Sequence, residues 1–225
     1  MKIPIVVAVF KTDKPVEEDS SKLRGYIGNK FPDEVLLHHH SEKGSLYTYP
    51  RIQYKIIEKT PIIVGIDEGA PLLKSIVDEI DVLKLGKRSY RVESIQMNQF
   101  NADFGKTRKY IKYKFLTPWL ALNQKNYEKF KETKDWKKRK EFLNGILVGN
   151  VLSISKSLGY FVKGKLHAHS LLYRTSVEYK AIPHIGFTGE FKINFNLPDY
   201  IGVGKGASHG FGTIRRMKIN DKKKT

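Results

Sequence analysis

A glycine-rich stretch near the C-terminus is the part of this sequence whose residue types and spacing point most directly to chemistry. Residues 202–212 read Gly-Val-Gly-Lys-Gly-Ala-Ser-His-Gly-Phe-Gly, so two Gly-hydrophobic-Gly pairs bracket five residues that include Lys205. Glycine reaches positive φ and lets backbone N–H groups come close to an anion. The stretch therefore predicts a phosphate-binding loop, for a phosphate that is free or part of a polymer. The alternative is a flexible turn between two elements.

Two common nucleotide-binding loops do not fit this stretch. A P-loop needs Ser or Thr after its Gly-Lys pair to hold magnesium, and Gly206 stands there. A dinucleotide fingerprint needs a third glycine where Ala207 stands, followed by a whole βαβ unit. The 13 residues after Gly212 leave room only for a short strand at 213–219.

The charge balance indicates a polyanionic partner. The 225 residues include 41 Lys and Arg against 23 Asp and Glu, a formal charge of +18, so nucleic acid is the first expected partner and an anionic membrane surface the second. No apolar run is long enough to span a bilayer, and the N-terminus begins as a strand, so we expect a cytoplasmic protein. The absence of cysteine excludes disulfides, thiolate zinc sites and a cysteine nucleophile. No cofactor is expected.

The elements that would position such a loop fall into two sets. In the first hundred residues the pattern predicts the order β-α-β-β-α-β, which is typical of a ferredoxin-like, split βαβ domain. We place this N-terminal domain at 1–104. Its predicted elements are a strand at 3–10, a helix after the acidic residues 17–19, strands within 36–57 and at 61–66, a helix at 70–83 and a strand at 90–97.

The second set predicts a degenerate ferredoxin-like domain at 105–225, and the fold class is α+β. The glycine-rich loop takes much of the place of its second helix. Apolar residues at helical spacing between Leu143 and Leu158 indicate the buried face of a long helix. The predicted elements are a strand at 110–116, a helix at 126–158, strands at 164–179 and 186–197, the loop at 202–212 and a last strand at 213–219.

Two split βαβ units in tandem, with paired glycines near the C-terminus, resemble the RAMP superfamily of CRISPR-associated proteins, and within it the endoribonucleases that cut repeat RNA into guides. Residues 38–40 (His-His-His), Tyr47 and the segment 49–55 (Tyr-Pro-Arg-Ile-Gln-Tyr-Lys) are similar to the archaeal type I-B branch, so the chain is identified as a Cas6b-like member of the Cas6 family. Carried over by position, the resemblance implies an active site of His38, His40 and Tyr47.

Cleavage of RNA without a metal needs a base for the 2′-hydroxyl and an acid for the 5′-oxygen, and it leaves a 2′,3′-cyclic phosphate and a 5′-hydroxyl. Histidine, with a pKa of about 6.5, suits both roles. If residues 38–40 are extended, His38 and His40 share one face of the strand. Tyr47, with a pKa of about 10, suits orienting the ribose or the phosphate.

Other interpretations of the histidines stay open. The triplet at 38–40 can be a solvated polar turn. His-x-His is also a good spacing for metal ligands, and His167 and His169 repeat it, but the sequence offers no convincing third and fourth ligand. We therefore predict no metal site. A metal-dependent phosphodiesterase is the least favoured function.

RNA binding is expected along a shared basic surface. Phosphate contacts give affinity, whereas unpaired bases and hairpin shape give specificity. Tyr49, Tyr54 and Tyr173 can stack on bases, although half-buried positions in a sheet are expected for them. The predicted RNA-binding residues are Lys22, Arg24, Arg51, Lys165, Arg174, Gly202, Gly204, Lys205, Ser208, His209, Gly210 and Gly212.

The expected partner is CRISPR repeat RNA, and the resemblance makes a homodimer and association with a CRISPR effector complex reasonable. A second function class is a non-catalytic RAMP subunit that holds guide RNA in an effector complex. It predicts tight RNA binding without strand scission.

Overall fold

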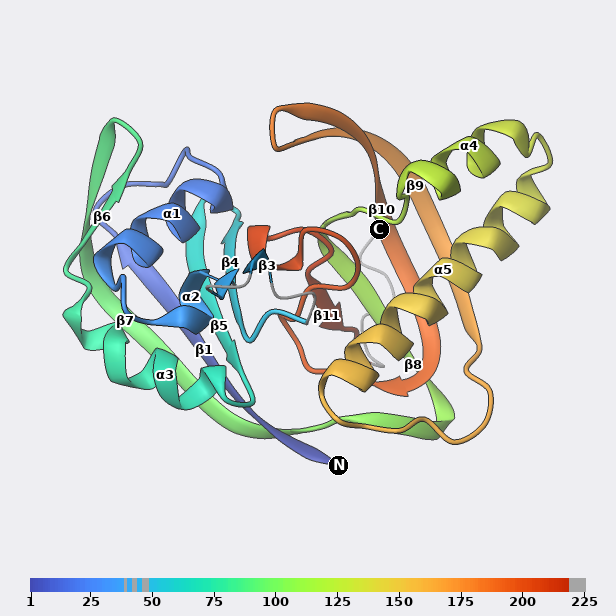
Figure 1. Cartoon of the computed structure of the whole chain (residues 1–225), viewed down its shortest axis with the longest axis horizontal. Coiled ribbons are helices and arrows are strands. Elements are labelled where there is room, and N and C mark those ends of the chain that lie inside the picture. Colours follow the sequence, from blue (N-terminus) through green and yellow to red (C-terminus); the bar gives the residue numbers. More distant parts are fainter. Residues whose placement is uncertain (39, 42–43, 46–48, 219–225) are drawn as a thin grey trace. The chain divides into compact units, whose positions relative to one another are not determined.

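The computed structural model describes residues 1–38, 40–41, 44–45 and 49–218, and for residues 38, 40, 41, 44 and 45 it describes the backbone only. The chain divides into two compact units (Figure 1). The N-terminal unit consists of residues 2–103 together with 207–210. The C-terminal unit consists of Met1, residues 104–206 and the chain from Phe211 onward.

The N-terminal unit is built on a five-stranded antiparallel sheet with helices on it, and it also contains a separate two-stranded sheet. The strand order is β4-β5-β1-β7-β6, in which the first four strands give the ferredoxin-like arrangement that the sequence predicts. Its elements are β1 (Lys2–Thr12), α1 (Ser20–Lys30), α2 (Val35–His38), β2 (His40–Ser41), β3 (Gly44–Ser45), β4 (Ile52–Ile57), β5 (Thr60–Ile66), α3 (Gly69–Ile76), the 3-10 helix η1 (Val77–Glu79), β6 (Val82–Leu85) and β7 (Arg88–Asp103).

Two parts of this unit differ from the sequence prediction. Helix α2 covers Val35–His38, where the predicted strand region 36–57 begins. The predicted helix at 70–83 ends at Ile76, and the chain forms the additional edge strand β6, whose residues pair with β7 from Val82↔Arg91 to Leu85↔Arg88. Leu83 and Leu85 are buried while Lys84 between them is exposed. This period of two is the strand pattern that the long helix assignment overlooked.

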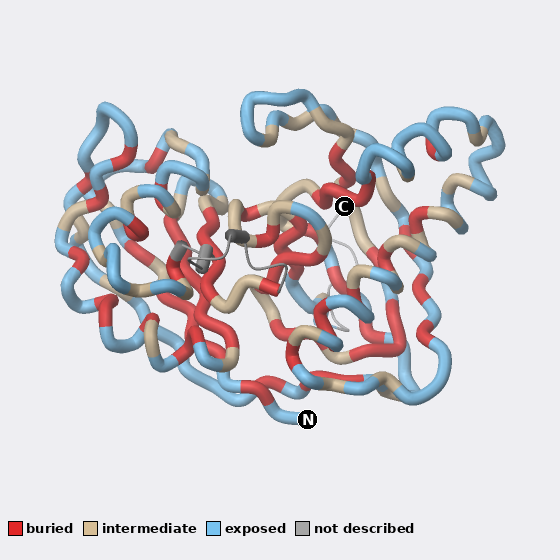
Figure 2. Tube along the Cα trace, in the orientation of Figure 1, coloured by how far each residue is buried: buried red, intermediate tan, exposed pale blue. Residues whose placement is uncertain are grey.

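The core of the N-terminal unit lies between the sheet and the helices. Alternate residues of β1, including Val6 and Phe10, pack with Leu23 and Ile27 of α1 and Leu73 of α3. Between them on β1, Val7 is buried and Val9 is partly buried, so the middle of this strand is buried on both faces. Figure 2 shows buried residues in the central strands of this unit.

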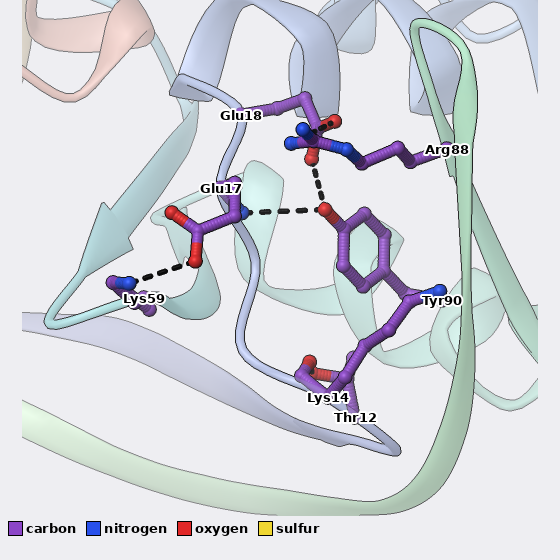
Figure 3. A network of polar contacts seen from close by, with 7 residues as sticks. All are labelled: Thr12, Lys14, Glu17, Glu18, Lys59, Arg88 and Tyr90. Carbon is purple, nitrogen blue, oxygen red and sulfur yellow. Dashed lines mark hydrogen bonds and ion pairs between the residues drawn. The ribbon is translucent and has the colours of Figure 1, made fainter.

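A polar network fastens the connection between β1 and α1 to β7 (Figure 3). The Tyr90 hydroxyl donates a hydrogen bond to the Glu18 carboxylate and accepts one from the Glu17 backbone N–H at 3.3 Å. Arg88 also pairs with Glu18, at 3.4 Å, and Lys59 pairs with Glu17, at 2.7 Å. Because Tyr90 is buried, its hydroxyl is a structural anchor that water cannot replace.

We expect Tyr90→Phe to lower the free energy of unfolding by about 2 kcal/mol, because the substitution removes a donor from Glu18 and an acceptor from the Glu17 N–H. Urea denaturation measures the change. The matched control is Tyr110→Phe, at an exposed tyrosine, with an expected change below about 0.5 kcal/mol. Equal stability of the two variants would contradict this role for the network.

The C-terminal unit repeats the same topology in degenerate form. Its sheet order, β11-β8-β10-β9, is the ferredoxin-like order, and all pairings are antiparallel. Its elements are β8 (Gly105–Trp119), α4 (Gln124–Glu132), α5 (Trp136–Ser157), β9 (Ala168–Tyr179), β10 (Ile182–Asn196) and β11 (Ile214–Arg216). The α+β fold class with two ferredoxin-like domains is confirmed.

The long helix predicted at 126–158 is two helices. The chain leaves α4 at Thr133, and Asp135 begins α5 by accepting a hydrogen bond from the Lys138 backbone N–H at 2.9 Å. The predicted buried stripe of α5 is confirmed, with Leu143 and Leu147 among its buried residues.

Candidate functional site

The glycine-rich loop is shared between the two units. Residues 207–210, which include the 3-10 helix η2 (Ala207–His209), pack against α1 and β4 in the N-terminal unit, whereas the rest of the loop belongs to the C-terminal unit. By their contacts these four residues therefore group with the N-terminal unit, and the rest of the loop groups with the C-terminal unit. At Gly210 the φ is +83°, and a Cβ atom would lie 2.3 Å from the Ser20 Oγ atom of α1.

Backbone hydrogen bonds hold the loop in place. The Val203 N–H donates to the Gly212 carbonyl at 2.9 Å, the Gly212 N–H to the Pro118 carbonyl at 2.8 Å, and the Lys205 N–H to the Leu120 carbonyl at 3.3 Å. Gly202 forms an isolated bridge with Thr213. These three N–H groups therefore stabilise the fold and do not line an anion, which corrects part of the expectation for this loop.

Gly212 is the glycine of this loop with the least room for a side chain. Its φ is +62°, and a Cβ atom would lie 2.0 Å from the Val203 carbonyl oxygen. We expect Gly212→Ala to cost about 3 kcal/mol of unfolding free energy, through the strained φ and the displaced backbone pair. Urea denaturation measures it. The control is Gly149→Ala in α5, where no atom lies within 4 Å of the added methyl, and there the stability should rise by about 0.5 kcal/mol. If Gly212→Ala is as stable as Gly149→Ala, the close contact of Gly212 with the Val203 carbonyl is contradicted.

Within the C-terminal unit, Lys205 meets two residues of the β9–β10 hairpin. Its ammonium lies 3.1 Å from the His184 Nε2 atom and 5.3 Å from the centre of the Tyr179 ring. Since Lys205 can only donate, His184 accepts through Nε2, and its Nδ1–H donates to the Ile182 carbonyl at 2.9 Å. Arg174 lines the same surface cavity of about 710 Å³ as His184 and Lys205.

Sequence reasoning assigned nothing to His184. It lies 21 residues before Lys205, in a segment with no motif, and the two side chains meet only in the folded chain. Tyr173 is 61% exposed, whereas a half-buried position in the sheet is expected from the sequence. Both residues add to the basic and aromatic surface of this unit.

Within the N-terminal unit, three of the predicted RNA-binding residues form one cluster. The Arg24 guanidinium of α1 donates to the His209 Nε2 atom at 2.9 Å, so the ring proton sits on Nδ1, which faces the Ser208 Oγ atom at 3.0 Å. Arg24 and His209 are 185 positions apart in the chain. Lys22 is exposed on the same helix. The arrangement presents two cationic groups, a hydroxyl and an imidazole from two distant segments.

Arg51 is engaged with acidic residues of its own unit. Its Nε atom donates to Glu68 at 3.1 Å and lies 4.0 Å from Asp67, and only 13% of its side chain is exposed. An RNA phosphate would compete with these carboxylates. RNA contact by Arg51 stays a prediction, and so does contact by Lys165, which lines a different cavity of the C-terminal unit from Arg174.

The three predicted catalytic side chains lie outside what the structure describes. Tyr47 is not among the described residues, and for His38 and His40 only the backbone is described. His38 ends helix α2, and His40 begins β2, where it pairs with Ser45. His38 is therefore helical and does not share a strand with His40, so strand alternation no longer explains why the two histidines would act together.

The segment after the histidines contains a buried lysine that sequence reasoning did not single out. Lys55, on β4, is fully buried, and its ammonium donates to the Gln53 Oε1 atom at 3.1 Å. Burial lowers the pKa of Lys55 to about 7, so the amine can exchange a proton near neutral pH. On the same strand Tyr54 is buried and donates to the Leu37 carbonyl at 3.3 Å, and burial raises its pKa. Tyr54 is a core residue, as the sheet pattern favours.

Among the residues that the structure describes, no group of three or more His, Asp or Glu side chains is placed to hold a metal ion. No helix of the described chain is both long and apolar enough to cross a membrane.

Comparison with known proteins covers nearly the whole chain. Family models of the Cas6b N-terminal domain and the Cas6b C-terminal domain match residues 1–103 and 105–217. A crystal structure of Cas6b is 38% identical with a TM-score of 0.91, and another, described as a CRISPR RNA processing endoribonuclease Cas6b, is 37% identical with a TM-score of 0.79. Each comparison covers 96% of this chain and 100% of the other.

Other relatives extend the same result. An uncharacterized protein of Methanocaldococcus jannaschii is 46% identical over 144 residues, which is 64% of this chain and 97% of that protein. A Thermus thermophilus Cas6 in a product complex shares the fold at 14% identity, with a TM-score of 0.59 over 96% of this chain and 99% of that one. Since both halves match one family and solved members superpose over the whole length, this chain belongs to the Cas6b branch of the Cas6 family.

Proposed function

We propose that this protein is an endoribonuclease that cleaves CRISPR repeat RNA into guide RNAs. The observation that carries the proposal is the similarity, at 37% identity over 96% of the chain, to a structure described as a CRISPR RNA processing endoribonuclease. The formal charge of +18 supports a polyanionic substrate. So do the two clusters around Lys205 and Arg24, in which imidazole rings accompany the cations.

The proposed reaction uses no metal ion. One of His38 and His40 takes the proton of the ribose 2′-hydroxyl, whose oxygen attacks the adjacent phosphorus, and the other donates a proton to the 5′-oxygen as the P–O5′ bond breaks. Tyr47 orients the ribose or the phosphate. The products are a 2′,3′-cyclic phosphate and a 5′-hydroxyl, and no water is consumed in this step. The support is the chemistry of these residue types and their resemblance to the type I-B branch.

We assign the two domains different tasks in this reaction. Domain 1–104 carries the histidines, and domain 105–225 binds the RNA through Lys205 and Arg174. Residues 207–210 contribute Ser208 and His209 beside Arg24, so the glycine-rich loop supplies phosphate contacts next to α1 as well. The cations give affinity and a strong dependence on salt.

The test is incubation of the purified protein with labelled CRISPR repeat RNA in excess EDTA, beside the same RNA with a 2′-deoxy residue at the cut site. We expect one cut in EDTA, and we expect the 2′-deoxy substitution to abolish it. If the RNA is cut without EDTA but not with it, the metal-independent step is contradicted. If the RNA binds tightly but is not cut with or without EDTA, the function is that of the non-catalytic subunit that holds guide RNA.

A homodimer and association with a CRISPR effector complex remain further proposals, supported only by the family resemblance. Light scattering on the purified protein tests the first of these. Copurification of a tagged chain with other CRISPR-associated proteins tests the second.

A further inference from the structure

A second basic cavity lies in the C-terminal unit, apart in sequence from the glycine-rich loop. It measures about 780 Å³ and is formed by the start of β8, the connection between α5 and β9, and the end of β10. Four cationic side chains line it, and no Asp or Glu is among its lining residues. The cations are Lys106, Arg108, Lys163 and Lys165.

The walls of this cavity are held by specific hydrogen bonds. Lys106 donates from its backbone N–H to the Tyr160 hydroxyl at 3.1 Å and from its ammonium to the Lys163 carbonyl at 2.9 Å. The Asn194 side chain of β10 accepts from the His167 backbone N–H at 2.7 Å and donates to the Lys165 carbonyl at 3.4 Å. The connection is therefore organised before any ligand arrives, which lowers the cost of binding.

None of the four cations has a carboxylate to neutralise it. Among the described residues these four form no ion pair, and all four are exposed. Arg108 and Lys106 line the cavity from the start of β8. Cations gathered without acidic partners raise the local positive potential and favour an anionic polymer.

An aromatic ring stands at the edge of the same cavity. Phe161 is 82% exposed, whereas its neighbour Tyr160 packs edge-on against Phe104 and Phe195, with ring centres 5.8 Å apart in both pairs. Tyr160 thus anchors the connection and leaves Phe161 in solvent. An exposed phenylalanine beside lysines provides a stacking surface for a base next to contacts for phosphates, which is the combination that single-stranded nucleic acids use.

From these observations we propose that this cavity binds a single-stranded segment of RNA, with a base stacked on Phe161 and backbone phosphates against Arg108, Lys163 and Lys165. It would hold unpaired RNA at a place other than the histidines and the glycine-rich loop. The inference rests on the proposed function for the choice of RNA as the polymer. A helical duplex is not favoured, because its bases are stacked on one another and cannot reach the phenylalanine.

The experiment measures the affinity of a labelled, unstructured 12-nucleotide RNA by fluorescence anisotropy in EDTA. Lys163→Gln/Lys165→Gln should weaken binding about tenfold and reduce the slope of log affinity against log salt by about 1.4, which corresponds to two lost phosphate contacts on a single strand. Phe161→Ala should weaken binding about fivefold with an unchanged salt slope. The charge-matched control is Lys74→Gln/Lys84→Gln, at exposed lysines of α3 and β6.

The outcomes separate this inference from the proposed function, because the 12-nucleotide probe contains no repeat. If the variants bind the probe as tightly as the control does, the inference is overturned even when the protein cuts repeat RNA. If they lose affinity, the inference stands even when no repeat is cut. The third outcome compares RNA with inorganic polyphosphate. If the double lysine variant loses as much affinity for polyphosphate as for the RNA, and Phe161→Ala loses none, the cavity binds polyanions in general and the choice of RNA is overturned.

Discussion

His38→Ala/His40→Ala is expected to cleave CRISPR repeat RNA about 10³-fold more slowly than the unchanged protein, while its affinity for the RNA stays within about twofold. Each histidine is proposed to move one of the two protons of the reaction, and general acid–base catalysis contributes about 10²- to 10⁴-fold. The cations proposed to bind the phosphates lie elsewhere in the chain. Single-turnover cleavage with enzyme in excess measures the rate constant without a contribution from product release.

The control for this variant is His169→Ala. His169 is an exposed histidine of β9, and its ring lies 5.5 Å from that of Tyr110. The control should leave the rate constant unchanged, which would show that losing a histidine from the surface does not slow cleavage by itself. If the double variant cleaves at the unchanged rate, the active site does not include this pair. If it fails to bind RNA, the histidines have a binding role.

The second large effect concerns the buried Lys55. The pKa of its ammonium is lowered from 10.5 to about 7 because burial disfavours the charged form. Between those two pH values the unfolded chain holds about one more proton than the folded chain, so the free energy of unfolding rises with pH by about 1.4 kcal/mol per unit. The folded state is thus penalised at and below pH 7, and the penalty disappears as the pH approaches 10.5.

We therefore expect Lys55→Met to be more stable than the unchanged protein by about 3 kcal/mol at pH 7. The advantage should shrink as the pH rises and reverse near pH 10 by about 1 kcal/mol, since the variant lacks the hydrogen bond to Gln53. Urea denaturation at four pH values between 7 and 10 measures the difference.

Lys84→Met, at an exposed lysine of β6, is the control for Lys55→Met and should give a difference that does not change with pH. If the stability difference between Lys55→Met and the unchanged protein also does not change with pH, the Lys55 amine is solvated in the folded protein. The same two variants, assayed for cleavage at each pH, would show whether a lysine with a pKa near neutral also takes part in the reaction.

The sheet arrangement was largely predictable from the order of the elements. Each half presents β-α-β-β followed by a helix or a loop and a last strand, and short connections with antiparallel pairing leave few alternatives. Two boundaries were predicted wrongly. The helix predicted at 70–83 includes the first residues of β6, which pairs with β7, and the single helix predicted at 126–158 is interrupted where Asp135 caps α5. In both places hydrogen bonds to other segments decided the local structure.

The candidate site was predictable in its residue types and less so in its arrangement. The loop glycines and Lys205 are recognisable in the sequence because their spacing is regular. The partners of Lys205 are not recognisable, because His184 and Tyr179 are distant from it in the sequence and meet it only in the folded chain. The amides of Val203, Lys205 and Gly212, expected to face an anion, bind protein carbonyls instead.

The sequence by itself determined the fold class, the basic character and the family resemblance, because composition, element order and the spacing of glycines are local or additive properties. Only the tertiary structure decided which distant residues share a cluster. It placed residues 207–210 with α1 and β4, joined Arg24 to His209, buried Lys55 and left Phe161 in solvent. Such contacts depend on the packing of segments far apart in the chain, and no local pattern of residues encodes them.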